Sequence, residues 1–159
     1  MIVKTIGCIL ILGASSCLSL MLGRMGSRRL YAIAEVKKLL IFISRNIESF
    51  LTPVGTILSS YRSDYLDSCG FSDAMKEDGL CAAFLRGYAD LPPEAEELMI
   101  NFAGELGDSY AEDEVKRCRH YITLLEEIET EEKARVEKNR DLYRFLPPLG
   151  ALSLIIILL

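Results

Sequence analysis

Side chains that could carry out chemistry are few in this chain, and they are scattered. His120 is the only histidine, so a histidine metal cluster or a Ser-His-Asp triad cannot be assembled within the chain. His120 stands beside Arg119 on the polar side of a helical pattern, which favours an ordinary surface histidine. The sequence contains neither a GxxxxGK[ST] phosphate loop nor a GxGxxG turn. We therefore predict no catalytic residue, no cofactor and no metal site.

The cysteines and the clustered glutamates also have ordinary interpretations. Five cysteines form no CxxC pair, which argues against a disulfide framework and is typical of a reducing compartment: Cys8, Cys17, Cys69, Cys81 and Cys118. We expect them to be small packing residues. Five glutamates spread around one predicted helix without a glycine turn, which indicates a solvated face and not a cation site: Glu126, Glu127, Glu129, Glu131 and Glu132.

Two apolar runs lie near the two ends of the 159-residue chain and could anchor the segment between them. Residues 5–23 carry no charge and would form a helix of about 28 Å, close to the ~30 Å core of a bilayer. Residues 145–159 form an apolar tail of about 22 Å, which reaches about 27 Å if it starts at Leu142 and Arg144 snorkels. We predict an N-terminal transmembrane helix in residues 1–23 and a C-terminal one in residues 145–159.

Basic residues flank both runs on the side of the intervening domain. Only Lys4 precedes the first run. The flanking basic residues comprise Arg24, Arg28, Arg29, Arg140 and Arg144. Both ends give the same answer by the positive-inside rule, so we expect the domain to face the cytoplasm. The alternatives are a cleaved signal peptide or a lipid-linked protein, since residues 14–17 faintly resemble a lipoprotein cleavage box.

The domain between the runs, residues 24–144, reads as an all-α bundle of about five helices. Its first helix shows apolar residues at steps of three and four, namely Ile33, Val36, Leu40, Ile43, Ile47 and Phe50, widened by Leu39 and Phe42. No segment shows the alternation of a half-buried strand. This first helix has no proline before Leu51, so it is compatible with a direct continuation of the N-terminal span.

Prolines, glycines and caps punctuate the rest of the domain. We predict a second helix with Thr52 as N-cap and Pro53 in its first turn, a loop at 67–73 and a weak third helix at 73–88. A fourth helix should begin after Pro92-Pro93 and stop at Gly107. The pattern Ser109-x-x-Glu112 predicts a capping box that opens a long last helix, with a seam of Val115, Cys118, Ile122 and Leu125. Pro147-Pro148 should kink this helix.

Charge is strongly patterned along the chain. Residues 24–50 carry six basic and two acidic residues, whereas residues 64–132 carry nineteen acidic and five basic ones. Such an acidic surface would repel phosphate, which argues against nucleic-acid binding. It suits a basic protein partner instead, and we predict the partner-binding face at Glu94, Glu96, Glu97 and Asp108.

The layout resembles the stage III sporulation protein AB family of endospore-forming bacteria. The residues that carry the resemblance are Thr52-Pro53-Val54, Leu106-Gly107-Asp108 and the ending, which runs LYRFL at 142–146, LGAL at 149–152 and six apolar residues at 154–159. The chain differs from the family pattern at Pro147-Pro148, and residues 64–90 show little likeness to it.

This resemblance implies a non-enzymatic platform component of the channel complex that joins the mother cell to the forespore. It implies a cytoplasmic domain similar to those of secretion and pilus platform proteins, in the mother-cell membrane around the forespore. The implied partners are the bilayer, a cytoplasmic sporulation ATPase and other channel-complex membrane proteins, and a homo-oligomer is compatible with the sequence. The rival hypothesis is a small membrane-anchored regulator or enzyme subunit that is active only within a complex.

Overall fold

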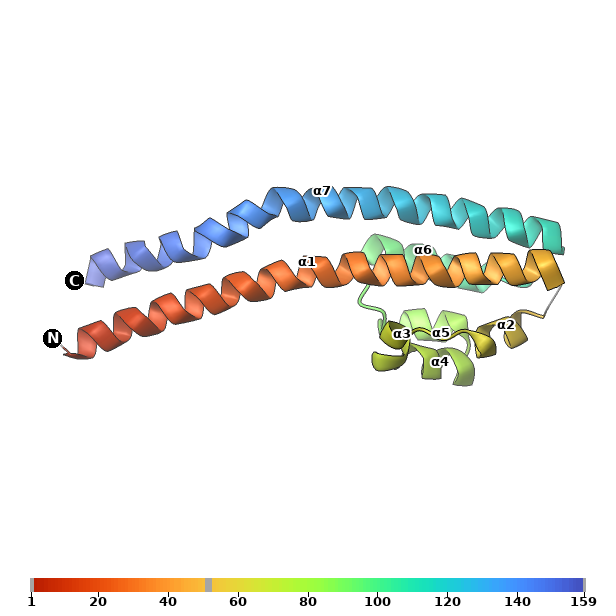
Figure 1. Ribbon diagram of the computed structural model, residues 1–159, viewed down its shortest axis with the longest axis horizontal. Coiled ribbons are helices and arrows are strands. Elements are labelled where there is room, and N and C mark those ends of the chain that lie inside the picture. The colour runs from red at the N-terminus through yellow and green to blue at the C-terminus, as the bar shows by residue number, and fades with distance from the viewer. Residues whose placement is uncertain (1, 51–52, 159) are drawn as a thin grey trace. The chain divides into compact units, whose positions relative to one another are not determined.

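The computed structural model describes residues 2–50 and 53–158, and every regular element in these ranges is a helix. Side chains are described at positions 13, 14, 17, 26–49 and 53–138. The described part contains α1 (Ile2–Phe50), α2 (Val54–Ser60), α3 (Asp64–Ser68), α4 (Phe71–Glu77), α5 (Leu80–Leu85), α6 (Pro93–Glu105) and α7 (Ala111–Leu158), as shown in Figure 1. The predicted all-α class is confirmed for this part of the chain.

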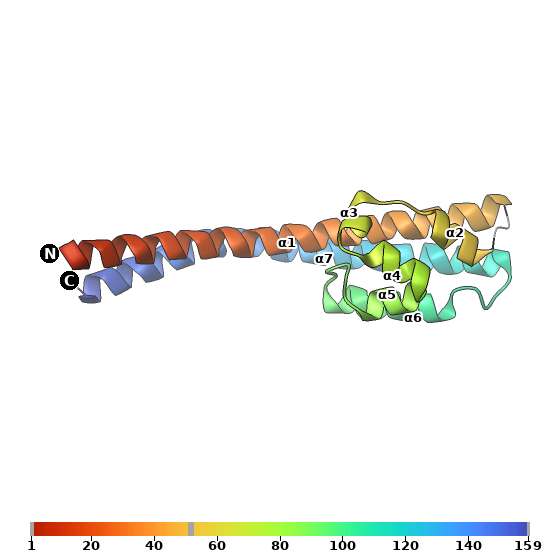
Figure 2. The same ribbon diagram turned by 90° about the horizontal axis from the view of Figure 1, so that it is seen from below.

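The chain divides into two compact units. The first combines Met1–Arg28 with Glu132–Leu159, and the second is Arg29–Glu131. Helices α1 and α7 each contribute to both units. The first helix of the domain is a direct continuation of the N-terminal helix, as the absence of proline allowed. Within the first unit, the two helical arms lie side by side and both chain termini are at the same end (Figures 1 and 2).

The predicted membrane spans fall almost wholly on residues whose side chains are not described. The backbone of α1 and α7 is helical through 2–23 and 145–158, and α7 runs on through Pro147-Pro148. Among the residues whose side chains are described, no helix has a stretch both apolar and long enough to cross a membrane. The predicted spans at 1–23 and 145–159, and the predicted kink, therefore lie almost wholly outside the residues whose side chains are described.

A glycine brings the two arms of the first unit into close contact. A Cβ atom placed on Gly26 would lie only 2.7 Å from Cγ2 of Val136 and 3.6 Å from its Cβ. Contacts as short as 2.7 Å do not occur between real side-chain atoms, and valine has little rotamer freedom in a helix with which to yield. Glycine at position 26 is therefore what allows this approach.

The second unit has one hydrophobic core, to which α1 contributes the stripe predicted from its spacing. Ile33, Val36, Leu39, Leu40 and Ile43 are fully buried, and Ile47 is nearly so. Phe42 packs against the core from its edge, whereas the side chain of Phe50 lies outside the described set. Burial of such side chains contributes about 1.5–3 kcal/mol each. The stripe therefore anchors α1 to the helices that follow it.

The middle of the chain differs from the prediction. Residues 67–73, predicted as a loop, contain the end of α3 and the start of α4, and the weak helix predicted at 73–88 is divided into α4 and α5. Gly70 and Gly79 precede α4 and α5 with φ of +81° and +91°, where only glycine is comfortable. These two positions end one short helix and start the next.

Two predicted helix starts also need correction. Pro53 occupies the N-cap position of α2 and does not lie in its first turn, and Thr52 is outside the described residues. The predicted capping box at the start of α7 is wrong in both members. Helix α7 begins at Ala111, so Ser109 is not its N-cap, and the Ser109 hydroxyl accepts a hydrogen bond from Arg117. The carboxylate of Glu114, not that of Glu112, accepts a hydrogen bond from the backbone N–H of Ser109, at 3.1 Å. Glu112 is exposed.

Helices α6 and α7 agree closely with the sequence. Helix α6 begins at Pro93 and ends one residue before Leu106, which is followed by Gly107 with φ of +99°. The seam of α7 is buried at Val115, Cys118 and Leu125, with Ile122 partly buried beside them. Phe102 of α6 packs against Tyr121 of α7 with ring centroids 5.1 Å apart. This pair joins the two helices within the core.

Candidate partner-binding site

The acidic first turn of α6 is fixed in place by the residues between its glutamates. Ala95, Met99 and Phe102 are fully buried and hold one side of α6 against the core. Glu94 and Glu97 consequently stay exposed, whereas Glu96 is half-buried. Carboxylates in a first helical turn are favoured by the helix dipole. The structure thus brings three of the four predicted partner residues together on one turn.

Asp108, the fourth predicted residue, lies away from this turn. It is exposed in the loop that follows α6, three residues beyond the last residue of the helix. The 13 residues of α6 span about 20 Å, so Asp108 and the Glu94–Glu97 turn are at opposite ends of the helix. The predicted face therefore separates into an acidic turn and a distant acidic loop.

A buried carboxylate that the sequence did not point to holds the loop around Asp108. Oε1 of Glu114 accepts hydrogen bonds from the backbone N–H of Gly107 and Ser109, at 3.2 and 3.1 Å, and from Arg117 at 2.8 Å. Arg117 also donates to the Glu105 carbonyl at 2.6 Å and to Ser109 Oγ at 3.0 Å. The Ser109-x-x-Glu112 pattern placed the acid two residues too early. Glu114 and Arg117 serve to shape the loop.

A second buried carboxylate, Glu35, joins α1 to the start of α3. Ser63 is the N-cap of α3, and its hydroxyl donates to Glu35 Oε2 at 2.7 Å while accepting from the backbone N–H of Leu66. Lys38 donates to Glu35 Oε1 at 2.6 Å. Burial alone would raise the pKa of Glu35, but the hydrogen bonds from Lys38 and Ser63 outweigh it and hold the pKa below its usual value of 4.5. Glu35 is thus a structural anion.

The hydroxyl and thiol groups of the core are kept protonated by their surroundings. Burial, followed by the charge of Glu35, raises the pKa of Tyr61 to about 12. Burial, followed by the charge of Glu114, raises the pKa of Cys118 to about 11. A thiol with such a pKa is a poor nucleophile at neutral pH. Cys118 is fully buried, in agreement with its predicted packing role.

The remaining candidates for chemistry do not converge. His120 is exposed, with its ring edge against Tyr121. Among the residues whose side chains are described, no group of three or more His, Cys, Asp or Glu is placed to hold a metal ion. A cleft of about 420 Å³ in the second unit contains neither histidine nor cysteine; its lining comprises Ile47, Glu48, Ala111, Glu112, Val115, Lys116 and Arg119.

The glutamate-rich part of α7 is less solvated than predicted. Glu126 and Glu129 pair with Lys37 of α1, with N–O distances of 3.6 and 2.7 Å. Glu132, in the first unit, is buried and pairs with Arg135 at 2.6 Å. Of the five glutamates, Glu127 and Glu131 are exposed and belong to none of these ion pairs, as the predicted solvated face requires. The two Lys37 pairs connect α1 to α7, whereas the Glu132–Arg135 pair lies within α7.

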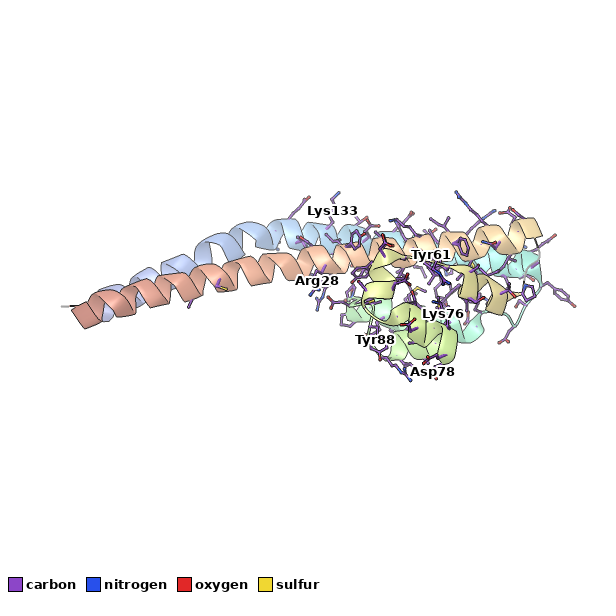
Figure 3. The ribbon with its side chains drawn as sticks, turned by 60° about the horizontal axis from the view of Figure 1, so that its bottom comes forward. Arg28, Tyr61, Lys76, Asp78, Tyr88 and Lys133 are labelled. Atoms are coloured by element: carbon purple, nitrogen blue, oxygen red, sulfur yellow. The ribbon has the colours of Figure 1, made fainter. Side chains whose placement is uncertain are left out.

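The structure describes the side chains of only two of the five basic residues predicted to flank the membrane. Arg28 is exposed and Arg29 half-exposed, and exposed Lys133 belongs, like Arg28, to the first unit (Figure 3). The side chains of Arg24, Arg140 and Arg144 lie outside the described set. The described basic residues therefore agree with positive charge next to the first apolar run.

Comparison with known proteins identifies the family of the chain. Neither the curated proteins nor the solved structures with which the chain was compared include a match. The sequence pattern of one protein family, described as Stage III sporulation protein AB, matches residues 4–159, which is nearly the whole chain. The chain therefore belongs to the stage III sporulation protein AB family.

Proposed function

We propose that this protein is a non-enzymatic membrane platform of the channel between mother cell and forespore, where it docks a cytoplasmic assembly ATPase and is required for endospore formation. Membership of the family implies a role in stage III of sporulation, and the family is not known as a family of enzymes. The observation that carries the proposal is the exposed acidic turn of Glu94 and Glu97, held rigidly by the buried side of α6. A rigid charged surface next to a packed core is a common basis for protein docking.

The proposed location is the mother-cell membrane around the forespore. Residues 5–23 and 145–159 are apolar enough in sequence to enter a bilayer, and both are followed or preceded by basic residues on the domain side. The unit Arg29–Glu131 would then face the cytoplasm, where an ATPase can reach the acidic turn. Basic residues near the bilayer favour the anionic cytoplasmic leaflet.

The test is co-purification of the full-length protein with the ATPase from sporulating cells. Reversal of the acidic turn, Glu94→Lys with Glu96→Lys and Glu97→Lys, should abolish co-purification, because a basic ATPase surface would then meet like charge. The wild-type association should weaken as salt is raised. A matched control reverses two exposed acids in the first turn of α7, Glu112→Lys with Asp113→Lys, and should retain the ATPase. Equal retention by the acidic-turn variant would contradict this docking face.

A further inference from the structure

Two large apolar side chains are exposed next to the acidic turn. Leu85, the last residue of α5, is 64% exposed, and Tyr88 in the following loop is 40% exposed. Among the side chains that the structure describes, Leu85 is the one large aliphatic residue that is exposed. A leucine and a tyrosine this exposed, three residues apart in the chain, leave apolar surface in contact with water unless a partner covers it.

The backbone beneath this pair is firmly held. The Tyr65 hydroxyl donates to the carbonyl of Ala89 at 3.2 Å, and Ala89 itself is buried. The backbone N–H of Gly87 donates to the carbonyl of Phe84 at 2.9 Å, which closes the end of α5. Leu91 is also buried, so the loop is tied to the core on the far side of Tyr88. The loop that carries the exposed pair is thus attached to the core on both sides of Tyr88.

The surroundings of the pair are acidic. Arg86, between the two apolar residues, is neutralised by Asp78 at 2.6 Å (Figure 3 labels Asp78 and Tyr88 on the same side of the unit). Oε1 of Glu96 lies 3.4 Å from where a Cβ on Gly87 would be, so the loop abuts the first turn of α6. Residues 77–97 contain one basic residue, Arg86, against six acidic ones: Glu77, Asp78, Asp90, Glu94, Glu96 and Glu97. The two exposed apolar residues therefore belong to a stretch with net negative charge, and their loop lies against the acidic first turn of α6.

We infer that Leu85 and Tyr88 are the anchor of a docking surface for a basic amphipathic segment of another protein. The apolar side of that segment would cover Leu85 and Tyr88, and its Lys or Arg residues would face Glu94 and Glu97. Tyrosine is a frequent hot-spot residue in protein interfaces, and charged residues around an apolar contact select the partner of complementary charge. The inference rests on the proposed function in taking the acidic turn as the partner face. A symmetric contact with a second copy is disfavoured, because it would place acidic residues against acidic residues.

The experiment places a photo-crosslinking amino acid at position 88 of the full-length protein in membranes of sporulating cells. The matched control carries it at Tyr110, which is 87% exposed and on a different loop. The expected result is a cross-link from position 88, but not from position 110, to a segment of another protein that contains both Lys or Arg and apolar residues. A cross-link to a second copy, to a segment without basic residues, or equally from both positions would overturn the inference.

A pair of variants separates the anchor from the charges. Leu85→Ser with Tyr88→Ser should reduce the cross-linked or co-purified partner at least tenfold, whereas Tyr110→Ser should leave it unchanged. Both variants alter exposed side chains, so unchanged thermal unfolding of the detergent-solubilised protein would show that the fold is kept. Unchanged partner binding by the double variant would overturn the anchor.

The outcomes also distinguish this inference from the proposed function. If the ATPase co-purifies normally while position 88 gives no cross-link to a basic segment, the docking surface is wrong and the platform function stands. If the ATPase is lost from the wild-type preparation while position 88 joins a basic segment of a different protein, the platform function is wrong and the surface stands.

Discussion

The ionisation state of Glu35 affects the stability of the second unit. Its two carboxylate oxygens accept from Ser63 and Lys38 and are almost completely buried. Its pKa is lowered in the folded protein, whereas the unfolded chain keeps the ordinary value. The stabilisation is therefore complete above the ordinary pKa of 4.5 and is lost as the pH falls through the lowered folded value.

We expect the Glu35→Gln variant to be less stable than the wild type at neutral pH. Its unfolding temperature should also fall less steeply as the pH is lowered. Loss of the buried charge-assisted hydrogen bonds should cost about 1–3 kcal/mol at pH 7. The measurement is thermal unfolding of the detergent-solubilised full chain from about pH 3 to pH 7. The control is Glu127→Gln, at an exposed position. Parallel profiles for Glu35→Gln and the wild type would contradict the role of Glu35.

Cys118 should be the least reactive of the cysteines whose side chains the structure describes. It is fully buried and its pKa is raised to about 11, so the thiolate is scarce at neutral pH. Alkylation of the folded protein, followed by mass spectrometry, should modify Cys69 and Cys81, which are partly exposed, well before Cys118. Denaturation should remove the difference. Equal rates in the folded protein would show that Cys118 is accessible.

At the scale of helices, the close contact between Gly26 and Val136 can be tested with one substitution that creates a clash and a second that relieves it. Gly26→Ala places a Cβ 2.7 Å from Cγ2 of Val136, and overpacking of this kind costs about 1–3 kcal/mol. We expect a lower unfolding temperature for Gly26→Ala and recovery in the double variant Gly26→Ala with Val136→Ala, which removes both γ-methyl groups. Val136→Ala alone is the control, and a drop that Val136→Ala does not reverse would contradict the steric explanation.

The long helices could be predicted from the sequence, whereas the short ones could not. The stripe of α1 and the seam of α7 extend over enough turns for the 3.6-residue period to stand out. Helices α3, α4 and α5 have five to seven residues, too few for a period, and they are stable only because tertiary packing offsets the cost of nucleating them. Gly70 and Gly79 were visible as interruptions, but not as helix starts.

The same contrast holds for the candidate site. Prolines at 92 and 93 and the acids that follow are local signals, so the acidic turn of α6 could be placed from the sequence. The position of Asp108 relative to that turn depends on the length of α6 along the surface. The exposure of Leu85 and Tyr88 depends on how their loop packs against α6, and no local pattern distinguishes them from buried apolar residues.

For the whole molecule, the distribution of charge and hydrophobicity leads to a test of topology. Protease added to sealed membrane vesicles whose cytoplasmic side faces inward should leave the full chain uncut, because both chain ends are expected in the membrane with the unit Arg29–Glu131 inside. In inverted membrane vesicles the same protease should cut that unit. An intact mass without cleavage or lipid is expected, and cleavage of that unit in the vesicles with the cytoplasmic side inward would contradict the proposed topology.

The contact that Gly26 permits has a practical consequence for the first unit. The Cβ positions of residues 26 and 136 are 3.6 Å apart, within the 3.5–4.5 Å range that a cystine bridge requires. Cysteines introduced at both positions, in a background without the native ones, would staple the arms under oxidising conditions and release them under reducing ones. Cytosolic thiols are normally kept reduced, so spore yield with and without a membrane-permeant oxidant would then show whether sporulation needs the two arms to separate.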